Sequence, residues 1–204
     1  MTTSILLGVA LAHLLAVASP GPDFMAVIKN TLQYGRKSGV LVSAGIACGL
    51  ILHCIFALTV LSSLIHWSPK ILPIMQIISA LYLLFLAFQC ARSKKPNEEI
   101  KNEKKTIGPF LVGLITNGTN PKVFVYISAM FTTLAGQFQP KILIAISIYL
   151  SFQTFGWFVL VSILFCQNKT RNIYFSHQKK IDLAMAIILV YFAAYILLNT
   201  NIVL

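Results

Sequence analysis

The chain has 204 residues, of which 57% are hydrophobic and only 10% are charged. Soluble domains carry about 25% charged residues, so a chain with a mean hydropathy of +0.82 has too few polar side chains to cover a soluble core. The composition therefore predicts an integral membrane protein. The net charge of +11 does not indicate a nucleic-acid partner, because the basic residues lie in short runs between apolar segments, as the positive-inside rule describes.

Six apolar segments follow one another, and each is predicted to be a transmembrane helix. They approach or exceed the roughly 20 residues that cross a bilayer core of about 30 Å, and they are too long and too uniformly apolar for barrel strands. Residues 1–10 hold no Lys or Arg, so we expect no signal-peptide cleavage after Ala16-Val17-Ala18. The segments cover residues 2–28, 38–65, 70–91, 107–135, 141–165 and 181–198.

The charges of the connecting loops predict the orientation. Thirteen of the sixteen basic residues fall in the first, third and fifth loops, at residues 29–37, 92–106 and 166–180. Only Lys70 and Lys141 fall on the other side, and Lys122 lies within the fourth segment. Basic loops stay in the cytoplasm, so both termini are predicted outside and the polar loop 92–106 inside. Five or seven spans would spoil this segregation.

The first segment contains a break. Residues 3–18 would form a helix of about 24 Å, which is too short to cross the bilayer. The chain must finish its crossing through Ser19-Pro20-Gly21-Pro22-Asp23-Phe24, where two prolines remove backbone donors and fit no continuous helix. We therefore expect the helix to stop and to restart with Pro22 in its first turn.

The fourth segment repeats this pattern. Asn117-Gly118-Thr119-Asn120-Pro121-Lys122 interrupts an apolar span. Asn120 is a suitable cap for a second half-helix, and Pro121 is a suitable first residue. Irregular backbone at membrane depth is tolerated only where protein or a cavity meets it, so both breaks are expected to face the protein interior.

The matching breaks predict a 3+3 inverted repeat within a single transmembrane domain, residues 1–204. Repeat 1 covers about residues 1–91 and repeat 2 about residues 107–204. Two homologous halves of three helices must insert with opposite orientations, as in many secondary transporters, whose substrate sites lie at broken helices. Two coincidental kinks in a structural membrane protein are the alternative.

Asp23 and Lys122 are the only charges well inside spans. Each costs roughly 2.5–3.5 kcal/mol at a helix centre on insertion scales, so each is expected to face a cavity or the other. In one hypothesis, Lys122 and the half-helix N-termini hold a substrate carboxylate, while Asp23 holds its ammonium group or carries a coupling proton. In the other, Asp23 and Lys122 form a structural ion pair.

Polar residues in other segments allow two interpretations each. Gly45, Gly49 and His53 share one helical face, and the glycines permit close helix approach. His53 is a candidate proton relay, although a hydrogen bond to a neighbour explains it equally well. Gln153, Thr154 and Trp157 favour helix packing over cavity lining. His13 has no supporting pattern, and Asp182 is expected at the membrane interface.

Four motifs together resemble the LysE/RhtB family of bacterial amino-acid exporters. They are Ser19-Pro20-Gly21-Pro22-Asp23-Phe24, Gly45-x3-Gly49-x3-His53, Ala80-Leu81-Tyr82-Leu83 and Asn120-Pro121-Lys122. The resemblance covers essentially the whole chain, including its length and its charged middle loop. It implies proton-driven efflux of amino acids or close derivatives, such as homoserine lactone, across the bacterial cytoplasmic (inner) membrane.

We therefore predict a secondary exporter with alternating access, whose partners are an amino-acid-like substrate, a coupling proton and the lipid bilayer. The candidate substrate residues are Ser19, Pro20, Gly21, Pro22, Asp23, Gly45, Gly49, His53, Asn117, Asn120, Pro121 and Lys122. No cofactor, metal or enzymatic activity is expected, because the sequence holds no phosphate loop, cysteine cluster or nucleophile–base pair. An exporter of another solute or cation, or a membrane scaffold, is the alternative. The oligomeric state stays open.

Overall fold

The structure, a computed structural model, describes residues 2–19, 21–61, 63, 71–92, 107–135 and 138–199. Every regular element in these ranges is helical, which confirms the all-α prediction for them. Pro20 and most of the predicted cytoplasmic loop, residues 93–106, lie outside the described residues. In chain order the elements are α1 (Thr2–Ala18), α2 (Pro22–Tyr34), α3 (Arg36–Phe56), the π-helix η1 (Ala57–Leu61), α5 (Ile71–Ala91), α6 (Pro109–Gly118), α7 (Pro121–Ala135), α8 (Pro140–Phe165) and α9 (Asn168–Asn199).

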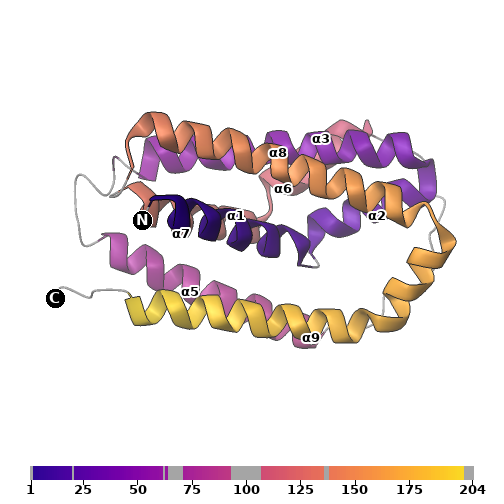
Figure 1. The fold of residues 1–204 in the computed structure, drawn as a ribbon. Coiled ribbons are helices and arrows are strands. Elements are labelled where there is room, and N and C mark those ends of the chain that lie inside the picture. The colour runs from indigo at the N-terminus through magenta and orange to yellow at the C-terminus, as the bar shows by residue number, and fades with distance from the viewer. Residues whose placement is uncertain are drawn as a thin grey trace.

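The helices form an elongated bundle (Figure 1). α3 and α8 run along one side and contact each other, and α5 and α9 run as a pair along the opposite side. The α1–α2 and α6–α7 pairs complete the bundle, with α6 packed closely on α3. The start of α1 and the end of α9 lie at the same end of the molecule.

Three apolar clusters form the interior. One joins α3, η1, α7 and α8 around Leu50, Ile127 and Leu150, and a second joins α2, α3 and α8 around Val27 and Phe158. The third contains buried residues of α5 and α9 alone, among them Ala80 and Ala193. The α5–α9 pair therefore has a core cluster of its own, and α5 also contacts α7.

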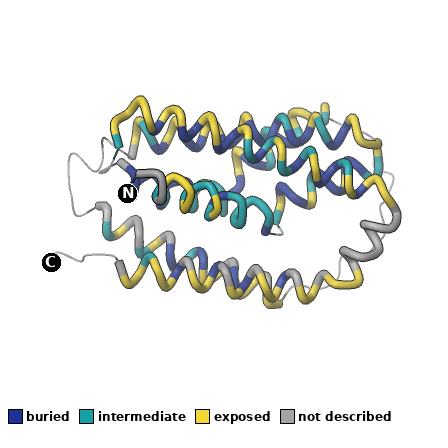
Figure 2. Tube along the Cα trace, viewed as in Figure 1, coloured by how far each residue is buried: buried dark blue, intermediate teal, exposed yellow. Residues whose placement is uncertain are grey.

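Exposed positions occur along most of the bundle (Figure 2), and many of them carry large apolar side chains. Phe152 of α8 is 71% exposed and Tyr191 of α9 is 65% exposed, which water would disfavour but lipid would not. Arg36–Val60 and Pro140–Phe165 are each long and apolar enough to cross a membrane. α1 and α2, bent by 56° at their break, supply a third crossing if they form one span. The chain is a multi-pass, all-helical membrane protein.

Prolines begin four of the described helices, because a first-turn residue needs no backbone donor. They are Pro22 in α2, Pro109 in α6, Pro121 in α7 and Pro140 in α8. The breaks predicted at the two proline motifs are therefore present, between Ala18 and Pro22 and between Gly118 and Pro121.

Two helices extend beyond the predicted apolar segments. α2 continues to Tyr34, past the predicted end at Ile28, and α9 begins at Asn168 rather than at Ile181. Hydropathy marks where a span leaves the apolar layer, whereas Lys, Arg and Gln continue a helix readily in polar surroundings. The apolar boundaries were therefore wrong as helix boundaries at these two positions, whereas α5 and α8 match the segments predicted at residues 70–91 and 141–165.

The close helix approach predicted for the glycines of the second segment is confirmed. A Cβ added to Gly45 of α3 would overlap the Phe110 carbonyl oxygen of α6. In the reverse direction, a Cβ added to Gly113 of α6 would overlap the Val42 carbonyl oxygen of α3. Paired small residues of this kind let two membrane helices bring their backbones into contact.

Replacing Gly35 with alanine is expected to destabilise the turn between α2 and α3. Gly35 has φ +81° and ψ 172°, a region that residues with a Cβ avoid, and the strain should cost about 1–3 kcal/mol. Thermal unfolding in detergent measures the loss. Gly108→Ala is the control, because Gly108 also precedes a helix but has φ −65° and open space at the Cβ position. Equal effects of both substitutions would contradict this account.

Candidate functional site

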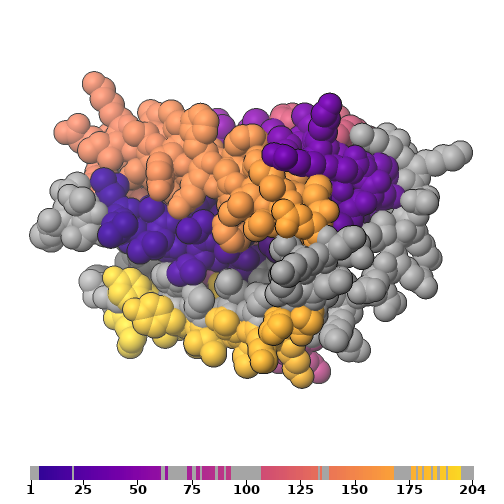
Figure 3. Space-filling model, turned by 45° about the vertical axis from the view of Figure 1, so that its right-hand side comes forward, coloured from indigo at the N-terminus to yellow at the C-terminus, as the bar shows by residue number. Residues whose placement is uncertain are grey.

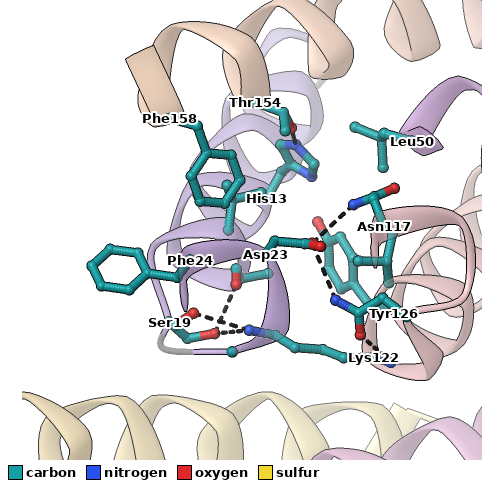
Figure 4. A pocket seen from close by; sticks show the side chains of 15 residues that line it. His13, Ser19, Asp23, Phe24, Leu50, Asn117, Lys122, Tyr126, Thr154 and Phe158 are labelled. Carbon is teal, nitrogen blue, oxygen red and sulfur yellow. Dashed lines mark hydrogen bonds between the residues drawn. The ribbon is translucent and has the colours of Figure 1, made fainter. Parts of the chain in front are cut away.

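The two helix breaks meet inside the bundle and bring together polar residues that lie far apart in the sequence (Figure 4). Ser19 and Asp23 come from the α1–α2 break. Asn117, Asn120 and Lys122 come from the α6–α7 break. The prediction that both breaks face the protein interior holds for these side chains, since four of them are buried and Lys122 is half-buried.

Asp23 lies in the first turn of α2 and is only 8% exposed. Its Oδ2 accepts hydrogen bonds from Asn117 Nδ2 at 2.9 Å and from Asn120 Nδ2 at 3.1 Å. Asp23 Oδ1 and Asn117 Oδ1 are also buried, and neither has a hydrogen-bond partner in the part of the chain that the structure describes. A buried acceptor without a donor is costly. The two oxygens could therefore accept hydrogen bonds from a ligand donor such as an ammonium group.

Lys122 lies in the first turn of α7 and reaches back across to the other break. Its Nζ donates to the Ser19 carbonyl oxygen at 3.2 Å and to the Ser19 hydroxyl. The Ser19 hydroxyl in turn donates to the Ala16 carbonyl oxygen at 2.7 Å. The ammonium group thus meets the carbonyl end of α1, where the helix dipole is negative.

Asn120 caps α7 in the predicted way. Its Oδ1 accepts the Lys122 backbone N–H at 3.1 Å, which satisfies a donor of the first helical turn. The same side chain uses its Nδ2 for Asp23. Asn120 therefore holds the start of α7 and the carboxylate of α2 together.

The two breaks contact each other reciprocally. The residue after Pro22 is bound by side chains of the α6–α7 break, and the residue after Pro121 binds the end of α1. Asp23 and Lys122 influence each other electrostatically, but each takes its own hydrogen-bond partners from the opposite break. The substrate-site hypothesis and the structural ion-pair hypothesis for Asp23 and Lys122 both stay predictions.

The glycine face of α3 supports the α6–α7 break from outside the cavity. His53 Nε2 donates to the Asn117 carbonyl oxygen at 2.9 Å, close to the end of α6. A Cβ at Gly49 would lie 2.9 Å from the Asn117 Cβ. Of the two interpretations of His53, the hydrogen bond to a neighbour is present, and proton relay stays a prediction.

A small cavity of about 30 Å³ lies between the two breaks. A water molecule needs roughly 10–15 Å³ on this measure, so the cavity has room for about two waters and not for an amino acid. Among the predicted site residues, Ser19, Gly21, Asp23, Asn117, Asn120 and Lys122 line it. Gly45, Gly49, His53, Pro22 and Pro121 are not among its lining residues. Pro20 lies outside the described residues.

Comparison with known proteins places the chain in a family. The family model described as LysE type translocator matches residues 14–200. The chain belongs to this family. No solved structure matches it.

Several relatives of this LysE-type translocator cover most of its length. It is 29% identical to the threonine efflux protein of Salmonella typhi, over 85% of this chain and 88% of the relative. The threonine efflux protein of Escherichia coli K12 is also 29% identical, over 86% and 89%. An uncharacterized membrane protein of Haemophilus influenzae is 26% identical over 95% and 96%.

Sequence reasoning missed two residues of the LysE-type translocator that line its cavity. His13 of α1 had no supporting pattern, and for Thr154 of α8 helix packing was favoured over cavity lining, yet both residues line the cavity. Ala16 and Val17, three and four residues after His13, line it too. This helical spacing, leading from His13 toward the break, was the available signal.

Other polar residues of the LysE-type translocator lie away from the cavity lining. Gln153 donates to the Ala10 carbonyl oxygen at 3.1 Å and so follows the packing interpretation. Asp182, expected at the membrane interface, is 2% exposed within the protein. Across the described residues, no three His, Cys, Asp or Glu side chains gather as a metal site requires.

Proposed function

We propose that this chain is a secondary transporter that exports amino acids or close derivatives from the cytoplasm. The observation that carries the proposal is the buried site between the two breaks. It offers a cation in Lys122 and a carboxylate in Asp23, together with two buried oxygens that lack donors within the described residues. These groups are complementary to the carboxylate and the ammonium group of an amino acid. The names of the threonine efflux relatives point the same way.

The proposal includes six spans in two inverted halves of one domain. α1–α2, α3 and α5 form the first half, and α6–α7, α8 and α9 form the second. The contacts support this division into halves, because α3 contacts α8 and α5 contacts α9. In each of these pairs, the two helices have the same position in the order of their own half. Likewise, α2 contacts α8 while α3 contacts α7. In this proposal the protein lies in the bacterial inner membrane. The loop 92–106 and the fifth loop lie on its cytoplasmic side, and both termini lie on the opposite side.

Transport in this proposal requires the two breaks to separate. The cavity is too small for an amino acid, so in this proposal the described conformation is one in which the site is closed. A substrate carboxylate replaces Ser19 as the hydrogen-bond acceptor for Lys122 Nζ. A substrate ammonium group donates to the oxygens of Asp23 and Asn117. Opening to either side of the membrane in turn is the alternating access expected of inverted repeats.

We also propose that transport is coupled to protons through the Asp23 carboxylate. Asp23 cannot hold a proton and a substrate ammonium group strongly at the same time, because protonation removes the negative charge that attracts the ammonium. A proton that arrives from outside therefore releases the substrate there, and a substrate that arrives from the cytoplasm releases the proton inside. Export of the substrate is thereby coupled to the entry of a proton down its gradient.

A metabolite efflux screen tests the proposed function. Cells with and without the protein are compared for the amino acids that they release and for their resistance to toxic amino-acid analogues. We expect at least one small amino acid to leave faster and resistance to its analogue to rise. No change across a broad panel, with the protein present in the membrane, would favour a scaffold instead.

A further inference from the structure

A buried polar pair lies on the opposite side of Asp23 from Lys122 (Figure 4). His13 Nε2 of α1 and Thr154 Oγ1 of α8 share a hydrogen bond of 2.8 Å. The two residues are 1% and 2% exposed, and both line the cavity between the helix breaks. The sequence motifs and the proposed ionic contacts leave this pair unexplained.

The side chains around the His13–Thr154 pair are mostly apolar, and the space that they enclose is small. Leu50, Val123 and Phe158 line the same cavity, and the His13 ring stacks on the Tyr126 ring with centroids 5.8 Å apart. Burying an imidazole and a hydroxyl among such side chains costs free energy unless they are hydrogen-bonded. An apolar pair would join α1 to α8 without that cost, so a polar pair at this point favours a role toward a ligand.

The cavity therefore has two chemically distinct ends. Asp23, Asn117, Asn120 and Lys122 form an ionic end, and His13 with Thr154 forms a neutral hydrogen-bonding end. A bound amino acid that places its charged groups at the ionic end directs its side chain toward the neutral end. A short side chain with one hydroxyl can join the His13–Thr154 hydrogen bond, because hydroxyls and imidazoles both donate and accept.

We propose that His13 and Thr154 are the specificity-determining residues for the side chain of the exported amino acid. This inference rests on the proposed function. The pair favours a short side chain with a hydroxyl over an apolar side chain of the same shape, since a site built around a hydrogen bond discriminates against a ligand that lacks it. Leu50 and Phe158 restrict the length of that side chain.

A purely structural role for the pair is the competing explanation, and the chain offers a matched control. Gln153 is the neighbour of Thr154 on α8 and also bonds to α1, through the Ala10 carbonyl oxygen. It is not among the residues that line the cavity. α1 and α8 lie side by side on one face of the molecule (Figure 3), so both hydrogen bonds join the same two helices.

The experiment compares efflux of radiolabelled threonine and valine, which have nearly the same shape, from proteoliposomes. Wild-type protein, Thr154→Val, His13→Gln and the control Gln153→Leu are reconstituted at equal protein content. We expect wild type to prefer threonine by about tenfold, from one hydrogen bond and the desolvation that its absence leaves uncompensated. Thr154→Val should reduce the preference to about twofold or less, mainly by faster valine efflux, and Gln153→Leu should leave the ratio unchanged.

The possible failures are distinguishable. If wild type exports amino acids but Thr154→Val and His13→Gln both keep its threonine-to-valine ratio, the specificity role is overturned and the proposed function stands. If Gln153→Leu changes the ratio as much as Thr154→Val, the pair acts through helix packing and the inference is again overturned. If wild type exports no amino acid at all, the proposed function itself fails. His13→Gln keeps a hydrogen-bonding side chain and serves if Thr154→Val does not fold.

Discussion

Asparagine in place of Asp23 is expected to reduce amino-acid efflux by at least about 30-fold. The substitution keeps the size of the side chain and one oxygen that can accept from Asn117 and Asn120. It removes the negative charge that pairs with a substrate ammonium group, and losing one partner of a buried charge pair costs about 2–5 kcal/mol. Initial efflux rates from preloaded proteoliposomes measure the loss.

Lys122→Ala should show a comparable loss, because it removes the cation proposed to hold the substrate carboxylate. Lys37→Ala is the matched control, since Lys37 is exposed at the start of α3. Protein abundance in the membrane must be equal in all variants. Near wild-type efflux by both Asp23→Asn and Lys122→Ala at normal abundance would rule out the site between the breaks.

Alanine at Gly45 or Gly113 is expected to destabilise the contact between α3 and α6 by about 1–3 kcal/mol. The new Cβ meets backbone in each case, and at Gly113 it would also lie 2.9 Å from the Ile46 nitrogen. Backbone atoms cannot rotate away as a side chain can, so the two helices must move apart. Because α6 carries Asn117, efflux should fall as well. Thermal unfolding in detergent and the efflux assay report the two effects.

Gly156→Ala provides the control for the helix-contact prediction. Gly156 lies in the middle of α8, and a Cβ built there has open space around it. Alanine also favours a helix more than glycine does, by about 1 kcal/mol, so this variant should be as stable as wild type or more so. A Gly45→Ala protein with unchanged unfolding temperature would refute the close contact between α3 and α6.

Much of the fold could be predicted because the solvent imposes it. Continuous apolar segments in lipid must satisfy their own backbone, which leaves helices. Prolines such as Pro22 and Pro121 locate helix starts through backbone chemistry that does not depend on neighbours. The end of α2 at Tyr34 and the start of α9 at Asn168 were not predicted, because hydropathy indicates the lipid boundary and not the limits of the helical backbone.

The candidate site was predictable only in part. Asp23 and Lys122 stood out because charges are rare and costly within spans. His13 and Thr154 did not, because a single polar residue in a membrane helix can also serve in helix packing, and 141 positions separate the two along the chain. Nothing local to either residue indicates the other.

The sequence by itself determined the class of protein, the breaks at the two proline motifs and the glycine face of α3, since each depends on local chemistry or on the solvent. Only the tertiary structure decided how these features combine. In it, Asp23 is hydrogen-bonded to Asn117 and Asn120, and Lys122 is hydrogen-bonded to Ser19. The His13–Thr154 pair lines the same cavity. The physical reason is that these hydrogen bonds join different helices, and their partners are chosen by how the helices pack.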